Sequence, residues 1–299
     1  MKQIDLPNGL RIQALNSAEA NVLYREIYAL QSYEKHGIEL TEGGCVFDVG
    51  ANIGLYSIFL SQRVPGLKLF AFEPIPDLFA VLQRNARSYF PNARLLNVGL
   101  SDRPGKASFT YTPSLSMTAG MYADKLNDSV QKEAGAYAWM QAALTDMGRA
   151  SVLPAALTRR LCRMLSRPIL RTPTLVLLAV PMLGSMLFQR LTTKHITCSL
   201  TTVSQLIREY ELDRIDLMKI DVEGSELDVI HGIEAHDWPR IRQLVIEVHD
   251  VDDRVKTMVN LLTDKGYRTT VDQEDWALHK LMNIYTLYAT RPTPPESPR

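Results

Sequence analysis

Residues 45–57, CVFDVGANIGLYS, decide the fold because they join an apolar run to a helix through a glycine-rich turn. The apolar start, residues 45–47, predicts a buried strand, and residues 55–63 follow with helical spacing. Between them, Gly50 and Gly54 let a ligand approach the backbone closely, and the free N–H groups at a helix N-terminus attract a carboxylate or phosphate. We therefore predict a ligand site at the carboxyl end of this strand.

A second strand and helix follow in the same order. Residues 68–72 predict a strand, and residues 76–89 predict a helix with proline in its first turn. Glu73 stands at the end of the strand, about 20 residues after the turn, where a carboxylate can accept the hydroxyls of a ribose. A solvated glutamate beside a tightly packed turn is the alternative interpretation.

The spacing of the turn favours S-adenosylmethionine over a dinucleotide. Asp48-x-Gly50-x-Asn52-x-Gly54 is one residue tighter than the dinucleotide fingerprint G-x-G-x-x-G. We expect Asp48 to orient the turn or to reach the methionine amino group, and Asn52 to hydrogen-bond the loop. Ser101 follows the third predicted strand and is a candidate adenine contact at the same edge. A simple turn is the alternative interpretation of Ser101.

Strands and helices continue to alternate along the rest of the chain. We predict strands at 94–98, 215–220 and 243–248, and helices at 225–233 and 252–265. This alternation is typical of an α/β fold with a doubly wound, mostly parallel sheet. The last two predicted strands, 267–271 and 284–289, have no crossover helix between them, so an antiparallel terminal strand is expected.

Three polar residues surround the end of the strand predicted at 215–220. Lys219, Asp221 and Glu223 alternate along the chain and therefore point to one side of the sheet. A buried lysine needs a partner, which Asp221 supplies. Asp221 is also a candidate for positioning the nucleophile or for serving as a second base. A plain Lys219–Asp221 ion pair is the alternative.

His249 is the first candidate for the catalytic base. It follows the strand predicted at 243–248, and Glu247 shares its face, so this carboxylate could orient the imidazole. Histidine suits the removal of a hydroxyl proton near neutral pH, and methyl transfer requires an aligned nucleophile. A histidine that caps the helix starting near Asp252 is the alternative.

Several side chains near these strand ends are also suitable metal ligands: Asp221, Glu223, His249 and Asp250. They lack the compact spacing of a motif such as H-E-x-x-H. We therefore predict no metal site.

The charge of the chain is balanced overall but unevenly distributed. The 299 residues include 33 basic and 33 acidic ones, which argues against a nucleic-acid-binding protein. No acid lies in the 62 positions between Asp146 and Glu209, which hold nine bases. Three cysteines without paired spacing and an N-terminus without a signal peptide predict a cytoplasmic protein.

The basic region lies within a predicted insertion at residues 115–198. Residues 159–171 read as a basic amphipathic helix, and the 18 uncharged residues 172–189 fall just short of a bilayer span. The alternatives are a lid that walls the acceptor pocket, a helix pair peripheral to an anionic membrane, a transmembrane helix, or a site for phosphate or a carrier protein. Both the lid and the peripheral helix pair predict a hydrophobic acceptor.

The remaining boundaries complete the predicted organisation. Residues 1–40 form a hairpin, with Asn8-Gly9 as its turn, and an amphipathic helix from residue 16 to about 33. Residues 41–290 form the catalytic domain around the insertion. The proline-rich tail 291–299 is expected to be disordered.

Taken together, the motifs resemble the FkbM family of S-adenosylmethionine-dependent methyltransferases. The matching segments are VFDVGANIGLYS, AFEPIPDLF, LNVGLSD, IDLMKIDVEGSELDVIHGI and DWPRIRQLVIEVHD. The chain is also similar to O-methyltransferase domains of polyketide and peptide synthases through NGLRIQALNSAEANVLYREIY and MYADKL. The resemblance implies a class I Rossmann-like fold and O-methylation of a hydroxyl on a polyketide, sugar or glycolipid.

The predicted function is therefore S-adenosylmethionine-dependent O-methylation of a hydrophobic natural product, of polyketide or peptide type, or of a lipid-linked sugar. The motifs indicate the donor and leave the acceptor atom open, so N- or carboxyl-methylation is an alternative. A catalytically idle membrane-associated module with the same fold is another.

Overall fold

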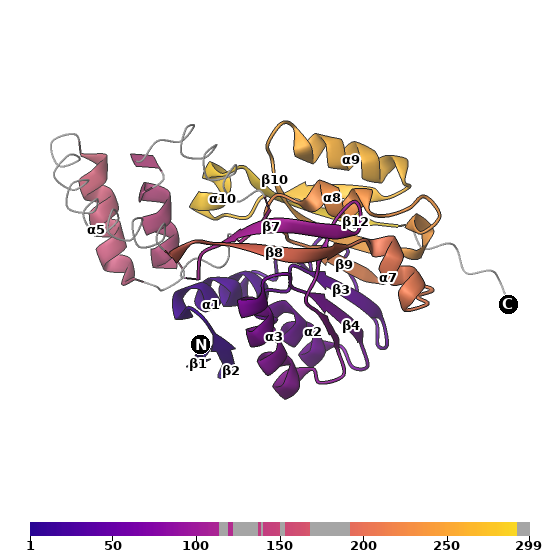
Figure 1. The fold of residues 1–299 in the computed structure, drawn as a ribbon. Coiled ribbons are helices and arrows are strands. Elements are labelled where there is room, and N and C mark those ends of the chain that lie inside the picture. Colours follow the sequence, from indigo (N-terminus) through magenta and orange to yellow (C-terminus); the bar gives the residue numbers. More distant parts are fainter. Residues whose placement is uncertain (114–118, 122–136, 139, 150–152, 168–191, 292–299) are drawn as a thin grey trace.

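The computed structural model describes residues 1–113, 119–121, 137–138, 140–149, 153–167 and 192–291. These residues form a layered α/β structure in which a twisted sheet lies between two groups of helices (Figure 1). The fold predicted from the sequence is confirmed.

The central sheet has the strand order β11-β12-β10-β9-β3-β4-β5. Its strands are β3 (Cys45–Val49), β4 (Lys68–Phe72), β5 (Arg94–Leu96), β9 (Leu217–Ile220), β10 (Gln243–His249), β11 (Arg268–Asp272) and β12 (Ile284–Thr290). Neighbouring strands are parallel except at β12, which is antiparallel to both β10 and β11. The predicted antiparallel terminal strand is therefore present, inserted between β10 and β11.

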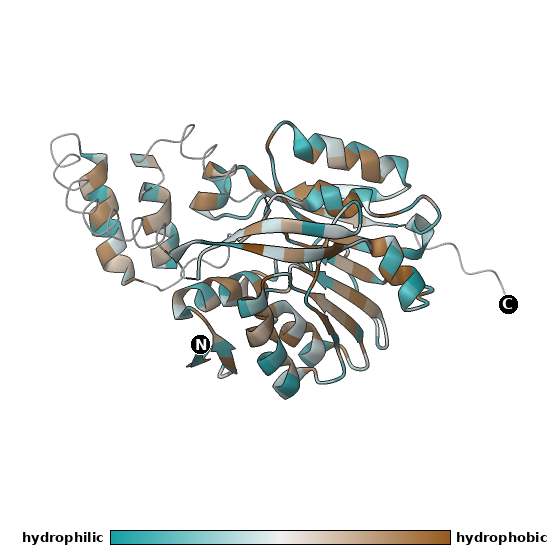
Figure 2. Ribbon diagram, viewed as in Figure 1, coloured by the Kyte–Doolittle hydropathy of each residue, from teal (hydrophilic) through white to brown (hydrophobic). Residues whose placement is uncertain are grey.

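Helices cover both faces of the sheet because its strands are apolar on both faces. The helices around it are α1 (Ser17–Tyr24), α2 (Leu55–Arg63), α3 (Pro76–Tyr89), α7 (Val203–Glu209), α8 (Glu226–His231), α9 (Arg254–Asp264) and a short 3-10 helix (Trp238–Arg240). In β3, Val46 packs in the core with α1, α2 and α3, whereas Phe47 and Val49 pack in the core with α7, α8 and α9. Hydrophobic residues accordingly concentrate along the strands in Figure 2. Such strands are typical of a doubly wound sheet.

A second sheet of order β6-β8-β7 crosses the front of the molecule (Figure 1). It contains β6 (Gly99–Leu100), β7 (Gly105–Tyr111) and β8 (Lys194–Thr201). Strand β8 starts inside the segment predicted as an insertion up to residue 198, so that boundary is corrected to residue 193. Ile196, Cys198 and Leu200 alternate with polar residues and pack on the core, but the polar start of the strand concealed this period.

The N-terminal residues belong to the same core as the central sheet. The predicted hairpin consists of β1 (Lys2–Asp5) and β2 (Arg11–Ala14), and Ile12 is buried in the core shared with α2 and α3. The single helix predicted from residue 16 to about 33 is instead α1 followed by a π-helix (Arg25–Ala29). A π turn is wider than an α turn and is often found at functional sites.

The described part of the insertion contains helical residues 140–149 and α5 (Ala155–Ser166), which overlaps the predicted amphipathic helix 159–171. It lies at one end of the molecule, beside α10 (Ala277–Leu281) (Figure 1). The Asp146 carboxylate accepts hydrogen bonds from the Ala277 and Leu278 N–H groups, at 2.9 and 2.7 Å. The insertion is thereby fastened to α10.

Two further predictions lie outside the described residues: the uncharged stretch 172–189 and residues 292–299 of the tail. Among the residues that the structure does describe, no helix is both long and apolar enough to cross a membrane.

Candidate active site

A cleft opens at the carboxyl ends of β3, β4, β9 and β10 and holds about 1050 Å³ of empty space, measured out to its open mouth. Gly50, Asn52 and Glu73 line one part, which we call the turn side. The other part, the acidic side, is lined by titratable residues from several elements: Glu26, Tyr33, Asp221, Glu223 and Glu247. A cleft at such a sheet edge is where ligands bind in folds of this kind.

Gly50 lets β3 and the end of β9 approach each other closely. Its φ is 76°, and a Cβ atom on it would lie 1.8 Å from the Asp221 carbonyl oxygen. Its N–H donates to the Phe72 carbonyl at 3.1 Å. A side chain at this position would have to displace the backbone of the β9 end, so the turn requires glycine here.

Asp48 and Gly54 support the turn from behind and do not line the cleft. Asp48 is fully buried and accepts a hydrogen bond from the Ser57 hydroxyl of α2 at 2.6 Å. Gly54 caps α2 with a φ of 83°, and a Cβ there would meet the Leu82 side chain at 2.6 Å. Of the two roles predicted for Asp48, the contacts favour orienting the turn.

Glu73 lies where the sequence predicted a carboxylate for a ribose. Its Oε2 accepts from the Asn52 N–H and its Oε1 from the Ile75 N–H, both at 2.9 Å. Each carboxylate oxygen has a second lone pair, so both can accept a further hydrogen bond from a ligand. Burial raises the pKa of Glu73 to about 7, although the two backbone N–H groups oppose this shift. Asn52 thus contributes its backbone N–H group to the hydrogen bonds of the loop.

Ser101 is buried but is not among the residues that line the cleft, whereas the preceding Val98, Gly99 and Leu100 are. Its hydroxyl donates to the Asp102 carboxylate at 3.3 Å, and its N–H donates to the Thr201 carbonyl at 2.9 Å. The N–H contact continues the pairing of β6 with β8, and the role of Ser101 as an adenine contact stays a prediction. The apolar residues just before Ser101 are placed to contact a ligand.

Lys219 connects the two sides of the cleft. Its ammonium group donates to the Gly50 carbonyl at 2.9 Å and lies 3.2 Å from Asp221 Oδ2 and 3.6 Å from Asp48 Oδ1. Burial alone would lower the pKa of Lys219, but the Asp221 and Asp48 carboxylates outweigh it and raise the pKa. The lysine therefore stays protonated and holds the turn against the end of β9.

The acidic side brings carboxylates close together. Oxygens of Asp221, Glu223 and Glu247 lie within 4.8 Å of one another. This group differs from the metal ligands considered from the sequence, because Glu247 takes part and Asp250 instead accepts the Val255 N–H at 3.0 Å. Burial is the main cause that raises the pKa of Glu223 to about 8.

The N-terminal segment contributes the rest of the acidic side. The Tyr33 hydroxyl lies 2.9 Å from Glu26 Oε1 and 3.2 Å from Asp221 Oδ2, and it can donate to either carboxylate. Burial, followed by the charge of Asp221, raises the pKa of Glu26 to about 7. Neither Glu26 nor Tyr33 was predicted from the sequence as a site residue. The only feature of the sequence that could have indicated them is the position of Glu26 next to the apolar face of the predicted helix.

His249 is 2% exposed and is not among the residues that line the cleft. Its Nε2 lies 3.4 Å from Glu223 Oε2 and its Nδ1 lies 3.8 Å from Glu226 Oε1. The carboxylates beside the imidazole are thus Glu223 and Glu226, and not Glu247 as predicted. Burial alone would lower the pKa of His249, but these two carboxylates raise it. The role of His249 as a base stays a prediction.

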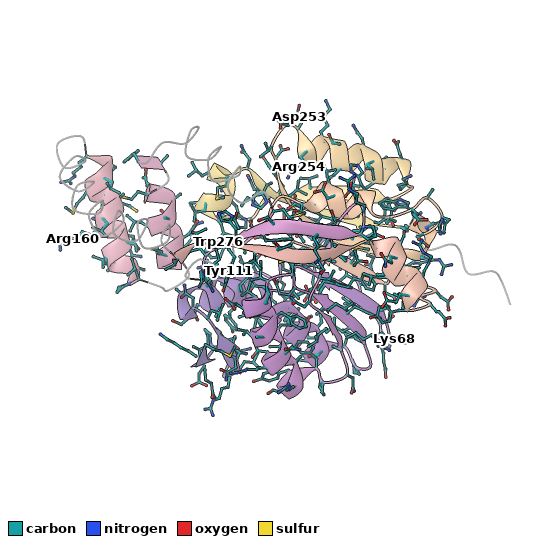
Figure 3. All side chains as sticks on the ribbon, in the orientation of Figure 1. Lys68, Tyr111, Arg160, Asp253, Arg254 and Trp276 are labelled. Atoms are coloured by element: carbon teal, nitrogen blue, oxygen red, sulfur yellow. The ribbon has the colours of Figure 1, made fainter. Side chains whose placement is uncertain are left out.

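Helix α10 contributes His279, which was not predicted from the sequence either, to the wall of the cleft. Burial lowers the pKa of His279 to about 4, so the imidazole is neutral at neutral pH. Trp276, labelled in Figure 3, lies under the Arg25 guanidinium with 4.9 Å between that group and the ring centre. This contact joins α10 to the π-helix that carries Glu26.

The chain is similar in sequence to several known proteins. Residues 174–269 match the Methyltransferase FkbM domain. The chain is 34% identical over 274 residues to the 31-O-demethyl-FK506 methyltransferase FkbM of Streptomyces tacrolimicus, with 92% of each chain covered. It is 32% identical over 300 residues to the AMB antimetabolite synthetase AmbE of Pseudomonas aeruginosa, which covers 99% of this chain and 13% of that one.

Among solved structures, methyltransferase FkbM from Methylobacillus flagellatus KT aligns with a TM-score of 0.45 and 13% identity, over 90% of this chain and 52% of that chain. The sequence match to the Streptomyces tacrolimicus protein covers nearly the whole of both chains. On that match, this chain belongs to the FkbM methyltransferase family.

Proposed function

We propose that the protein transfers a methyl group from S-adenosylmethionine to a hydroxyl oxygen of a hydrophobic natural product, of polyketide or peptide type, or of a lipid-linked sugar. The observation that carries the proposal is the cleft itself. One part of the cleft is a turn that suits the donor, and the other part is a group of carboxylates that suits a hydroxyl. Lys219 contacts both parts.

S-adenosylmethionine is the donor because the chain belongs to a methyltransferase family. The residues present fit this molecule. Glu73 keeps two acceptor positions for the ribose hydroxyls, and the cleft wall beside it includes the apolar Val98 and Leu100. When bound, the donor supplies a methyl group on a sulfonium, which in-line attack by a nucleophile displaces.

The acidic side favours a hydroxyl as the acceptor group. Carboxylates accept hydrogen bonds from a hydroxyl and can orient it, whereas they repel an acceptor that is itself a carboxylate. Carboxyl-methylation is therefore the less favoured alternative. The name of the Streptomyces tacrolimicus relative, a 31-O-demethyl-FK506 methyltransferase, also specifies an oxygen as the methylated atom.

Lys219, Asp221 and His249 have different roles in this proposal. Lys219 holds Asp221 beside the turn, and Asp221 would position the acceptor. His249 lies behind Glu223, so it would act on the acceptor through that carboxylate.

The insertion is proposed to contact an anionic partner and to wall the acceptor pocket. Helix α5 exposes Arg159, Arg160 and Arg163, none of which forms an ion pair with a described residue. Figure 3 shows Arg160 on the side of α5 away from the sheets. A membrane surface or a carrier protein with a phosphate-bearing arm would match this charge. Flotation with anionic vesicles, compared with neutral ones, tests the membrane partner.

Incubation with methyl-labelled S-adenosylmethionine and fractionated cell extract tests the function. We expect label in an apolar small molecule, and fragmentation of the product should place the methyl group on oxygen. A Glu73→Ala variant serves as the control with a weakened donor site. Label on nitrogen or on a carboxylate would reassign the acceptor, and no transfer to any fraction would favour an idle module.

A further inference from the structure

Glu247 differs from every other carboxylate that lines the cleft in having no partner. It lies on β10 opposite Thr286 of β12 and is 9% exposed. Among the described residues, none forms a hydrogen bond or an ion pair with its side chain. A buried carboxylate without a partner is costly, which indicates that a bound ligand meets it.

The other acids of the cleft are already engaged. Glu73 accepts two backbone N–H groups, and Asp221 pairs with Lys219. Glu223 lies against the His249 imidazole, and Glu26 contacts the Tyr33 hydroxyl. Within the described part of the cleft, Glu247 therefore has two oxygens available to a substrate.

The surroundings of Glu247 suit a carboxylate that must take up a proton. Burial, then the charges of Asp221, Glu26 and Glu223, raise the pKa of Glu247 well above its ordinary value, while Lys219 opposes the shift. The titratable groups around it come from three other parts of the chain and from β10 itself: Lys219, Asp221, Glu223, Glu26, Tyr33, His279 and His249. A raised pKa favours the uptake of a proton by this carboxylate.

We infer that Glu247 is the general base of the methyl transfer, an inference that rests on the proposed function. The acceptor O–H bond breaks and its proton passes to an Oε atom of Glu247. The oxygen forms its bond to the methyl carbon as the carbon–sulfur bond breaks, and the sulfur keeps that electron pair. The resulting carboxylic acid of Glu247 releases its proton to solvent before the next turnover.

This assignment changes the role of His249. Glu223 separates the imidazole from the cleft, so His249 would hold Glu223 in place and stabilise its charge. His249 is then a positioning residue, and its replacement should affect catalysis less than that of Glu247.

The test compares Glu247→Gln with Glu42→Gln, which makes the same change at an exposed position outside the cleft. Once label transfer by the wild type has identified an acceptor fraction, kcat is measured on that fraction and donor affinity by calorimetry. We expect kcat to fall about 100-fold or more in Glu247→Gln, with donor affinity changed less than about threefold. Glu42→Gln should match the wild type in both.

A wild-type kcat in Glu247→Gln would overturn the inference but leave the proposed function intact, whereas absence of transfer by the wild type would overturn both. If Glu247→Gln does not fold, Glu247→Asp keeps the charge and withdraws it by one methylene. It should lower kcat by about tenfold with unchanged donor affinity, and an unchanged kcat would contradict the inference.

The same assays distinguish a base from a metal ligand, because Asp221, Glu223 and Glu247 are close enough to share a cation. We expect EDTA to leave wild-type kcat unchanged. Loss of activity in EDTA that Mg²⁺ or Mn²⁺ restores would overturn the role of Glu247 as the base.

Discussion

The turn side and the acidic side of the cleft are built in different ways. The turn side comes from one stretch of chain, between Gly50 and Glu73, and backbone groups make most of its contacts. The acidic side is assembled from the π-helix, the end of β9 and the middle of β10, and side chains make its contacts. The donor is thus recognised by local backbone geometry, and the acceptor by residues that only the tertiary fold brings together.

The structures of the two sides are also constrained by different physical effects. Close packing fixes the turn side, since Gly50 leaves no room for a Cβ atom beside the Asp221 carbonyl. On the acidic side, burial, followed by repulsion between the carboxylates, raises the pKa values of Glu26 and Glu223 to about 7 and about 8. Unfavourable charge of this kind is common where a protein meets its substrate.

The largest effect should come from steric change on the turn side. Gly50→Ala places a Cβ atom 1.8 Å from the Asp221 oxygen at a φ of 76°, so we expect a loss of about 3 kcal/mol or more in the free energy of unfolding. Gly43→Ala is the matched control, because Gly43 has a φ of 75° with nothing within 4 Å. It should cost about 1 kcal/mol. Equal losses in urea unfolding would show that strain at φ, and not the close contact, fixes the turn.

The next effect concerns the pH dependence of stability at Glu73. A folded pKa of about 7, above the ordinary value of 4.5, means that the folded state holds this proton more tightly. Its contribution to stability is complete below about pH 4.5 and is lost as the pH rises through 7. Between pH 4.5 and pH 8, the wild type should therefore lose at most about 3 kcal/mol more stability than Glu73→Gln.

Urea unfolding at the two pH values measures this difference, and Glu42→Gln is the exposed control. A wild-type pH dependence in Glu73→Gln would mean that Glu73 is ionised at ordinary pH, and that burial affects the turn side less than the acidic side.

The smallest effect should come from the link between the insertion and α10. Asp146→Ala removes the acceptor of two N–H groups of α10, which carries His279 into the cleft wall. We expect about 1 to 2 kcal/mol lower stability and a severalfold higher KM for the acceptor, with unchanged donor affinity. Asp213→Ala, at an exposed position, is the control. A weaker donor affinity instead would connect the insertion to the turn side.

The same difference between the two sides explains what could be predicted from the sequence. The bounds of α2, β4 and α3 were predicted to the residue, because apolar period, glycine turn and proline are all local signals. Glu73 was placed correctly in the cleft for the same reason. Long-range contacts carry no such signal, so Glu26, Tyr33 and His279 were missed.

The position of a residue along a strand predicted less reliably whether its side chain lines the cleft. Glu247 and His249 lie two residues apart on β10, yet Glu247 lines the cleft and His249 lies behind Glu223. Alternation shows which face of the sheet a side chain occupies, but the depth of a cleft depends on the loops that cover it. Glu223, in the loop after β9, lies 3.4 Å from the His249 imidazole.

Calorimetric titration of S-adenosylmethionine tests the division of the cleft most directly. We predict saturable one-to-one binding to the wild type, weakened about 100-fold or more in Glu73→Ala through the loss of charge-assisted hydrogen bonds. In Glu247→Gln, binding should stay within about threefold of the wild type. Equal affinities in the wild type and Glu73→Ala, or an equal loss in both variants, would contradict a donor site on the turn side that is separate from the acidic side.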